Sequence, residues 1–365
     1  MIAESLLRQI EIGRSGKQWG YSMGLPKLEE IIDGVSRGVY TLVFSPTGSG
    51  KSSLALYSYV YRPLMEHLDD GNFKVSYFSL EMSAEMIYAK LLSMYIFETY
   101  GIELSTKELL SKKKNYKLSL EYYKMVQDCM PWLKKVEKVL TIYDKSLSAG
   151  SLYTILMKEL EKCGKFEDTG GRKIYHPDNE NLVHLVVIDH LSLVRRSEGR
   201  TLKEEMDLIS SYLVTLRNMC KISPLVIMQA NRNSTSMDRR KEGLNNLRID
   251  DTKDTGAPAQ DSEIIISIFN PHREKLATYR GYDIKHLGPN FRSITVLKNR
   301  YGEADVEVGC AFYGAVSVFA ELPKPDDIYD YEKYTSSEWL LHDESPEDSI
   351  KIEDEEPNQT YNFIL

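Results

Sequence analysis

The sequence predicts an α/β fold: a doubly wound, mostly parallel sheet flanked by helices and closed by a β-hairpin. Three observations support this prediction. Short apolar runs alternate with amphipathic helical stretches along most of the chain. Polar or glycine-rich turns follow several of these runs, as they do at the carboxyl ends of parallel strands. The last apolar stretch, residues 306–320, is not interrupted by a helix, so we expect it to form the hairpin.

The individual elements follow from the same periodicities. The expected strands are 40–44, 74–78, 139–143, 184–188, 224–228, 264–269 and 293–297. The expected helices are 26–32, 52–61, a helical region over 85–140, 151–161 and 202–220. Residues 164–181 and 271–290 are expected to be surface insertions, and residues 233–258 a mobile loop without apolar periodicity.

The first strand runs into a glycine-rich loop that is typical of phosphate binding. Gly48 and Gly50 allow backbone N–H groups to point inward, and the start of the following helix adds positive potential. Lys51 is expected to reach the β- and γ-phosphates, and Ser52 to ligate magnesium. The residues expected to surround the phosphates are Ser45, Pro46, Thr47, Gly48, Ser49, Gly50, Lys51, Ser52 and Ser53.

One residue of this loop departs from the strict pattern. Glycine is usual where this chain has Ser45, but serine is small, and we expect the tight turn to survive. The alternative is a chance Gly-Lys-Ser in a surface loop. The strand before the loop and the helix after it favour phosphate binding.

Composition is that of an ordinary globular protein, with 42% hydrophobic and 27% charged residues. No apolar run approaches the roughly 20 residues needed to span a bilayer, and the amino terminus has no signal-peptide core. The cysteines lack metal-ligand spacing, and we expect reduced thiols in a cytoplasmic protein. They are Cys129, Cys163, Cys220 and Cys310.

The formal net charge of −8 is unevenly distributed. Residues 324–365 hold 13 acidic residues and 3 lysines, a net of −10, which leaves about +2 on residues 1–323. Nucleic-acid binding by the body is therefore not excluded. We expect 324–365 to be an acidic, disordered tail with an apolar tip at 361–365. Such a tail could solubilise the protein, dock a partner or mimic nucleic acid.

At the amino terminus, residues 2–12 have the apolar spacing of a short amphipathic helix, which Gly13-Arg14-Ser15-Gly16 separates from the rest. A lone helix of this length is marginal in water. We therefore expect it either to fray or to dock on another surface.

Three polar side chains close other expected strands. Glu81 follows the strand 74–78, where a carboxylate could orient and deprotonate an attacking water. Asp189 closes the strand 184–188, a position that holds magnesium through water in many nucleotide hydrolases. Gln229 follows the strand 224–228 and could sense the γ-phosphate. The alternatives are a surface acid near a helix start for Glu81, a turn aspartate for Asp189 and a buried, backbone-bonded glutamine for Gln229.

Together these features indicate a magnesium-dependent nucleoside triphosphatase with a RecA-like P-loop fold. Over about residues 1–323, outside the two insertions, the chain contains in this order G-L-P-K-L-E-E-I-I-D-G-V-S-R-G, S-P-T-G-S-G-K-S, Y-F-S-L-E-M-S, L-V-V-I-D-H-L-S-L, I-M-Q-A-N-R, D-T-G-A-P-A-Q-D-S-E and L-K-N-R-Y-G. This ordered set resembles the motor domain of DnaB-type replicative helicases. The S-L-E-M string is the most specific feature of the resemblance.

The resemblance implies an ATP-dependent DNA helicase that forms a ring of six subunits, binds ATP and Mg²⁺ between neighbours, and moves 5′ to 3′ on single-stranded DNA. It implies that residues 1–16 are a linker helix that docks on the adjacent subunit, and that residues 17–323 are the motor domain. Family members usually carry an N-terminal collar domain that engages primase. This chain begins at the linker helix, which favours a phage-type or collar-less variant.

The resemblance also assigns roles to side chains. Glu81 would be the general base and Gln229 the γ-phosphate sensor, with Asp189 beside the magnesium. Lys298 and Arg300 would reach into the neighbouring subunit's site and stabilise transition-state charge, as an arginine finger does. From the residues alone, this pair would be a solvated strand end.

The expected DNA contacts lie in the family's channel loops. There, backbone amides and a basic side chain hold successive phosphates without regard to sequence. Lys253 stands where arginine is usual, which keeps the charge but loses the fork-shaped donor set. The residues that the resemblance assigns to DNA are Arg232, Lys253, Asp254, Thr255 and Gly256.

Two other functions remain open. A RecA-type recombinase would share the core but form filaments, and a nucleotide-gated scaffold or loader would not unwind DNA. The S-L-E-M string and the spacing of Lys298 and Arg300 favour the helicase. Its expected partners are single-stranded DNA, further copies of the chain, and a primase, loader or single-strand-binding protein in a bacterial cell.

Overall fold

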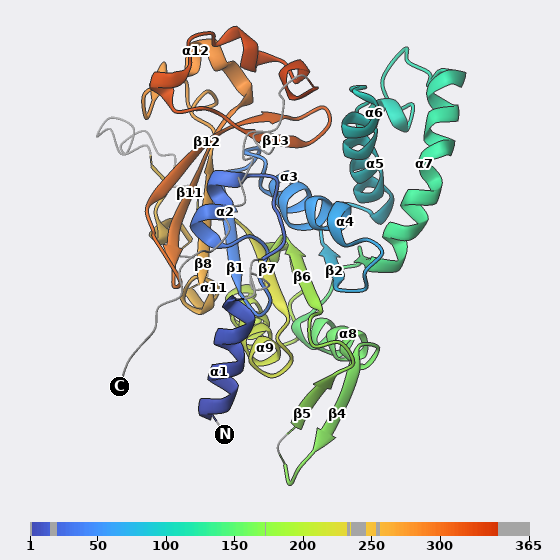
Figure 1. Ribbon diagram of the computed structural model, residues 1–365, viewed down its shortest axis with the longest axis vertical. Helices are drawn as coiled ribbons and strands as arrows, with labels where there is room; N and C mark the ends of the chain where they lie inside the picture. Colours follow the sequence, from blue (N-terminus) through green and yellow to red (C-terminus); the bar gives the residue numbers. More distant parts are fainter. Residues whose placement is uncertain are drawn as a thin grey trace, which may run out of the picture.

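A computed structural model describes residues 2–14, 20–171, 173–231, 234, 246–252 and 256–341. Its centre is a nine-stranded sheet with the order β13-β12-β11-β8-β1-β7-β6-β2-β3 (Figure 1). The strands of this sheet are β1 (Thr41–Ser45), β2 (Phe73–Ser79), β3 (Leu140–Tyr143), β6 (Val183–Asp189), β7 (Ser223–Gln229), β8 (Ile264–Phe269), β11 (Phe291–Asn299), β12 (Val306–Tyr313) and β13 (Val318–Glu321).

The sheet confirms the predicted fold class. Neighbouring strands from β8 through β1, β7, β6 and β2 to β3 pair in parallel. β11 pairs antiparallel with both β8 and β12, and β12 pairs antiparallel with β13. The predicted closing hairpin is therefore present.

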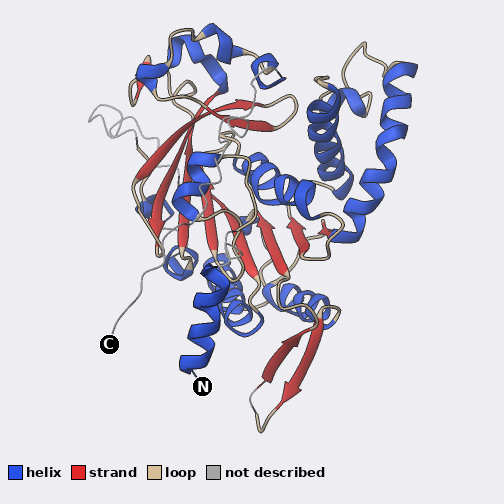
Figure 2. Ribbon diagram, in the orientation of Figure 1, coloured by secondary structure: helices blue, strands red, loops and turns tan. Residues whose placement is uncertain are grey.

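Helices cover both faces of the sheet (Figure 2). The chain steps one way across the sheet from β1 to β2 to β3, and back from β3 through β6 and β7 to β8. Because parallel crossovers are right-handed, connections that run in opposite directions lie on opposite faces. One face therefore carries α3 (Lys51–Leu54), a π-helical segment (Ala55–Tyr61), α4 (Arg62–His67), α5 (Ala84–Tyr100), α6 (Thr106–Leu109) and α7 (Leu120–Val139). The other face carries α8 (Ala149–Glu161), α9 (Leu202–Cys220) and α11 (Gly256–Asp261).

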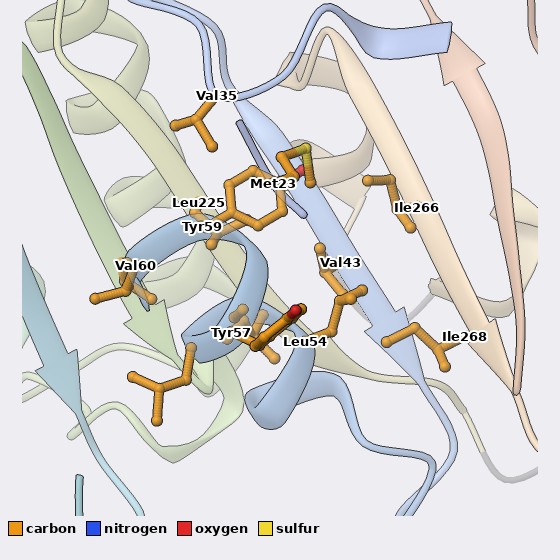
Figure 3. Close-up of a cluster of buried hydrophobic side chains, with 14 of the residues drawn as sticks. Met23, Val35, Val43, Leu54, Tyr57, Tyr59, Val60, Leu225, Ile266 and Ile268 are labelled. Carbon is orange, nitrogen blue, oxygen red and sulfur yellow. The ribbon is translucent and has the colours of Figure 1, made fainter. Parts of the chain in front are cut away.

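The helical segment after β1 is packed tightly on the sheet. The single helix predicted over 52–61 forms as α3 followed by the π-helical turn, whose residues are all buried. Its side chains, including Tyr57 and Tyr59, lie among residues of β1, β7 and β8 (Figure 3). This packing fixes the start of α3, and with it the glycine-rich loop, relative to the strands.

The regions expected to be insertions contain regular structure. Residues 164–181 form a hairpin, β4 (Gly164–Asp168) and β5 (Lys173–Pro177), which extends from the body beside α8 (Figure 1). Between β8 and β11 lie β9 (Thr278–Tyr279), β10 (Tyr282–Asp283) and α12 (Ile284–Leu287). Three helices, α5 to α7, enclose a second, smaller apolar cluster.

The expectation of a disordered tail is wrong for the segment 324–341. This segment forms short 3₁₀ turns, and Tyr334 and Trp339 are buried against the main core. The Trp339 indole donates to the Tyr313 hydroxyl, which donates to the Tyr334 carbonyl. Charge counting missed the segment because its buried aromatic residues alternate with exposed acids. Residues 342–365 lie outside the described residues.

The predicted amino-terminal helix is present as α1 (Ile2–Arg14), and the predicted helix 26–32 as α2 (Pro26–Ile32). Leu6, Leu7 and Ile10 of α1 are each at least half exposed. All four cysteines are free thiols, as predicted. Of the helices in the described ranges, none combines the length and apolar character needed to cross a membrane.

Candidate functional site

The candidate site lies at the carboxyl edge of the parallel strands. In the sheet register Ser45 at the end of β1 pairs with Gln229 of β7, and Ser79 at the end of β2 pairs with Asp189 of β6. The glycine-rich loop follows Ser45, and Glu81 follows Ser79. The structure therefore brings the predicted loop and the three predicted strand-end side chains to one edge, where open α/β sheets bind ligands.

The glycine-rich loop has the conformation that its glycines predict. Gly48 has φ 77° and Gly50 has φ 103°, values that side chains with a Cβ rarely adopt. Ser45 is buried without a positive φ, and its hydroxyl donates to the Pro46 carbonyl over 3.0 Å. The turn thus survives the replacement of glycine by serine, as predicted. Lys51, the first residue of α3, is buried beside this turn.

Asp189 lies at the centre of a small hydrogen-bonded group. The Ser52 hydroxyl donates to its Oδ1 over 2.9 Å, and the hydroxyl of fully buried Tyr77 donates to its Oδ2 over 2.8 Å. Burial raises the pKa of Asp189 above its ordinary value, whereas the bonds from Tyr77 and Ser52 lower it. Both carboxylate oxygens are therefore held in place, one of them by the serine that the sequence pairs with it.

The donor set at this position suits magnesium. Mg²⁺ is usually bound by one or two protein oxygen ligands together with substrate phosphates and water. Ser52 and Asp189 supply a hydroxyl and a carboxylate at hydrogen-bond distance from each other. No group of three or more His, Cys, Asp or Glu side chains in the described ranges could form an all-protein metal site. A nucleotide-dependent magnesium site therefore fits these residues better than a permanent metal centre.

Glu81 lies beside a histidine that the sequence patterns did not single out. Its side chain is 57% exposed, and its Oε2 is 3.7 Å from Nε2 of His190. The other ring nitrogen of His190 is hydrogen-bonded to the Ser192 hydroxyl at 2.7 Å. Burial and the nearby Lys51 ammonium lower the pKa of His190, which favours the neutral ring. Glu81 thus borders the site with its carboxylate open to a ligand.

Gln229 closes β7 with an exposed side chain. The alternative prediction, a buried glutamine bonded to backbone, is therefore wrong. Its neighbour Ala230 donates to the Ser45 carbonyl over 2.9 Å, which ties the end of β7 to the start of the loop.

The predicted cation pair lies at the opposite edge of the sheet. Lys298 and Asn299 of β11 pair with Ile265 and Ile264, at the amino end of β8. The Lys298 amine donates to the carbonyls of Ala259 and Gln260 over 3.0 and 3.1 Å.

Arg300 lies beside Lys298 at this amino edge. It is 53% exposed, and its Nη1 lies 3.5 Å from Oε1 of buried Glu263. The structure therefore does not bring the pair to the phosphate loop of its own chain.

Two further arginines contact the phosphate loop from behind. Arg273 donates to the Thr47 carbonyl over 2.5 Å, and Arg292 donates through Nε to the Ser49 carbonyl over 2.7 Å. They are 226 and 243 residues away from these partners along the chain, so no local pattern could reveal them. Tyr77, by contrast, lies four residues before Glu81, and His190 directly follows Asp189. Examining the residues around the ends of β2 and β6 could have found both.

Most of the predicted DNA contacts lie outside the described residues. These are Arg232, Lys253, Asp254 and Thr255. The fifth, Gly256, is the first residue of α11, whose Pro258 and Ala259 are buried. The Lys298 amine donates to carbonyls at the end of this helix. One residue of the expected cation pair is therefore bound to the helix that begins at the end of the expected DNA loop.

Comparisons with known proteins identify the family and the fold. A family model described as DnaB-like helicase C terminal domain matches residues 20–321. The replicative DNA helicase DnaB of Leifsonia xyli subsp. xyli (strain CTCB07) is 23% identical over 313 residues, 85% of this chain. The chain spans 57% of the length of that relative.

Two solved structures share the fold. One is described as an ATPase domain; its TM-score is 0.66 at 17% identity, with coverage of 88% of this chain and 99% of that one. The other is a DnaB-like replicative helicase described with its interactions with primase; its TM-score is 0.63 at 17% identity, with coverage of 88% and 67%. Since the family model covers most of the sequence, the chain belongs to the DnaB-like helicase C-terminal domain family.

Proposed function

We propose that the chain is the ATPase motor of a replicative DNA helicase. In this proposal it binds ATP and Mg²⁺ at the phosphate loop, hydrolyses ATP at the subunit interfaces of a six-membered ring, and moves 5′ to 3′ along single-stranded DNA in a bacterial cytoplasm. Family membership supports the ATPase and the DNA substrate.

One observation supports hydrolysis at subunit interfaces above the others. Lys298 and Arg300 lie at the amino end of β8, whereas the phosphate loop lies beyond the carboxyl end of its neighbour β1. The six residues of β8 span about 17 Å at about 3.3 Å per residue, more than an arginine side chain reaches. The pair can serve a phosphate loop only if that loop belongs to another subunit.

The side chains of one subunit then take defined roles. Lys51 neutralises the β- and γ-phosphates, while Ser52 and Asp189 hold the magnesium ion that ATP brings with it. Glu81 orients a water molecule in line with the γ-phosphate and accepts its proton. Gln229 contacts the γ-phosphate and changes position when it leaves. Because Gln229 and the loop are tied at Ser45, that movement can be transmitted to β7.

The neighbouring subunit supplies the remaining charge. Its Arg300 leaves the half-exposed pair with Glu263 and stabilises charge on the transferred phosphoryl group. Its Lys298 is bound to the end of α11, so that nucleotide contact and the segment after the DNA loop are mechanically linked. We place Arg232 and residues 253–256 against the DNA backbone. One similar helicase is described with its interactions with primase, so primase is the first partner to test.

The test is DNA-stimulated ATP hydrolysis by the purified protein, together with its assembly state by electron microscopy. The proposal predicts closed rings, turnover that single-stranded DNA increases, and unwinding of a forked duplex from the 5′ tail. Filaments with DNA-stimulated turnover would favour the recombinase alternative. ATP binding without turnover would favour the scaffold or loader.

A further inference from the structure

Two arginines, Arg273 and Arg292, each donate a hydrogen bond to a carbonyl of the phosphate loop, and we call this pair the latch. Arg292 is 5% exposed at the start of β11, and its Nε donates to the Ser49 carbonyl over 2.7 Å. Its Nη1 donates to the carbonyls of Pro289 and Phe291, and the guanidinium lies 5.0 Å from the ring centroid of Phe312. Every one of these contacts is to a backbone oxygen or an aromatic face.

Arg273 reaches the same loop from the region between β8 and β11. Its Nη1 donates to the Thr47 carbonyl over 2.5 Å, and its side chain is exposed. The guanidinium lies so close to the loop that a Cβ on Gly48 would come within 2.1 Å of Nη1. A side chain at position 48 would therefore displace the tip of Arg273, in addition to the strain imposed by the positive φ of this residue.

Within the part of the chain that the structure describes, no carboxylate forms an ion pair with Arg273 or Arg292. Burial and the charge of Arg273 lower the pKa of Arg292 to about 10, which still leaves it protonated at neutral pH. Two positive charges thus stand behind a loop that is shaped to receive an anion.

The carbonyls that the arginines bind belong to two particular peptide groups. The Thr47 carbonyl shares a peptide group with the Gly48 N–H, and the Ser49 carbonyl shares one with the Gly50 N–H. In the described ranges no backbone acceptor is found for either N–H. Because hydrogen bonds in a chain polarise one another, a cation on the carbonyl makes the N–H at the other end of the peptide a stronger donor.

We propose that Arg273 and Arg292 are positioning residues that hold the phosphate loop in its anion-binding conformation and strengthen the Gly48 and Gly50 N–H groups as phosphate donors. The inference rests on the proposed nucleotide-binding function. It adds that the insertion between β8 and β11, together with the start of β11, contributes to phosphate affinity from within the same subunit. The arginines act through the loop and do not touch the nucleotide.

The inference is tested with Arg273→Ala, because this side chain is exposed and its loss leaves the core intact. Arg273→Lys keeps the charge, and Arg292→Lys tests the buried partner. Arg37→Ala is the matched control: Arg37 is also exposed and donates through Nε to a single carbonyl, that of Leu182, at the amino end of β6. Calorimetry measures the binding of MgADP and of magnesium pyrophosphate, which has no base or ribose. Hydrogen exchange of residues 45–53 is followed without nucleotide.

We expect Arg273→Ala to weaken MgADP and pyrophosphate by the same factor, about tenfold for one charge-assisted hydrogen bond. We also expect it to speed amide exchange in the loop. Arg273→Lys should recover part of the affinity, and Arg37→Ala should change neither property. Arg292→Lys should show the same loss of affinity and the same faster exchange as Arg273→Ala. If Arg292→Lys does not fold, the results for Arg273→Ala alone test the proposal.

Three results would overturn the latch. Weaker ADP binding with unchanged pyrophosphate binding would mean that Arg273 contacts base or ribose. Weaker pyrophosphate binding with unchanged exchange would mean direct contact with phosphate. Unchanged affinity for both ligands would mean that the bond to Thr47 only fastens a surface loop. Wild-type protein that binds neither ligand would instead refute the proposed function, and the latch with it.

Discussion

The two edges of the central sheet differ in how their polar side chains are satisfied. At the carboxyl edge, Ser52 and Tyr77 hold both oxygens of Asp189. In the loop beside them, the N–H groups of Gly48 and Gly50 have no backbone acceptor within the described ranges. At the amino edge, Lys298 and Arg300 make contacts that a stronger partner can replace. The Lys298 amine binds two backbone carbonyls, and Arg300 is half exposed beside Glu263.

This difference is consistent with a carboxyl edge that receives the nucleotide and an amino edge that contacts a nucleotide bound to a neighbouring copy. At the carboxyl edge, hydrogen bonds hold both oxygens of Asp189 in place, which preorganises that carboxylate. The amino edge offers cations on an exposed strand end, which suits a contact that forms and breaks. In the proposed function, one chain therefore carries two half-sites, and two neighbouring copies complete one site. The following experiments test that comparison, in order of decreasing effect.

Arg300→Ala should have the largest effect, because it removes the transition-state charge supplied to the neighbour. We expect kcat to fall by about 10³–10⁵, with ADP affinity of the carboxyl edge unchanged. Stability should change little, since exposed ion pairs contribute roughly 0–1 kcal/mol and Arg217 still pairs with Glu263. Arg280→Ala, another half-exposed arginine in an ion pair, is the control. Normal turnover of Arg300→Ala would show that the amino edge is not part of the site.

Glu81→Gln tests the carboxyl edge. Loss of the general base should lower kcat by about 10²–10⁴ while ATP still binds. Glu85→Gln is the control, since Glu85 is an exposed acid in the first turn of α5, a few residues further along. Equal turnover of the two variants would support the alternative that Glu81 is an ordinary acid near a helix start.

Tyr77→Phe tests the rigidity of the carboxyl edge without removing a ligand. Losing one hydrogen bond to the buried Asp189 carboxylate should raise the Mg²⁺ concentration for half-maximal hydrolysis about tenfold. It should also weaken Mn²⁺ binding in the ADP complex, measured by electron paramagnetic resonance. Tyr143→Phe, which removes a tyrosine–carboxylate bond to Glu159 from neighbouring β3, should leave both values unchanged. An equal effect of both variants would mean general loosening of the sheet.

Buried His184 makes the stability of the central sheet, which joins the two edges, dependent on pH. It is fully buried in β6 against the Ser76 hydroxyl, and burial lowers its pKa to about 3. The unfolded chain binds a proton near pH 6.5, so this stabilisation is complete above that pH and is lost as the pH falls toward 3. Between pH 7 and pH 5 we expect a loss of about 2 kcal/mol in the free energy of unfolding.

Urea unfolding of wild type and His184→Gln at the two pH values measures this loss. The variant should show a smaller difference between pH 7 and pH 5, because it lacks the titrating ring. The same pH difference in both proteins would assign the acid sensitivity to other groups.

Much of the fold was predictable because the strands are short apolar runs with polar ends. The predictions for 202–220 and 264–269 match α9 and β8 residue for residue. The segment 324–341 was predicted to be disordered from its net charge, a measure that takes no account of the buried side chains of Tyr334 and Trp339. The regular structure within 164–181 and 271–290 was missed because short hairpin strands with exposed faces have no clear apolar period.

The candidate site divides in the same way. Asp189 and Glu81 were predictable because Asp189 closes the buried strand β6 and Glu81 comes shortly after the end of β2. Arg273 and Arg292 were not, since contacts between segments more than 220 residues apart leave no trace in local spacing. The position of Lys298 and Arg300 relative to their own loop also depends on the antiparallel turn of β11, which periodicity alone does not reveal.

The most direct test of two half-sites is a mixing experiment with Arg300→Ala and Glu81→Gln. Each variant alone lacks one half of every site, so each should be nearly inactive. In mixed assemblies, some interfaces join an intact carboxyl edge to an intact amino edge, and DNA-stimulated ATP hydrolysis should return in proportion to their number. If mixing restores no activity although the variants assemble together, Glu81 and Arg300 do not meet across a subunit interface, and the central claim is wrong.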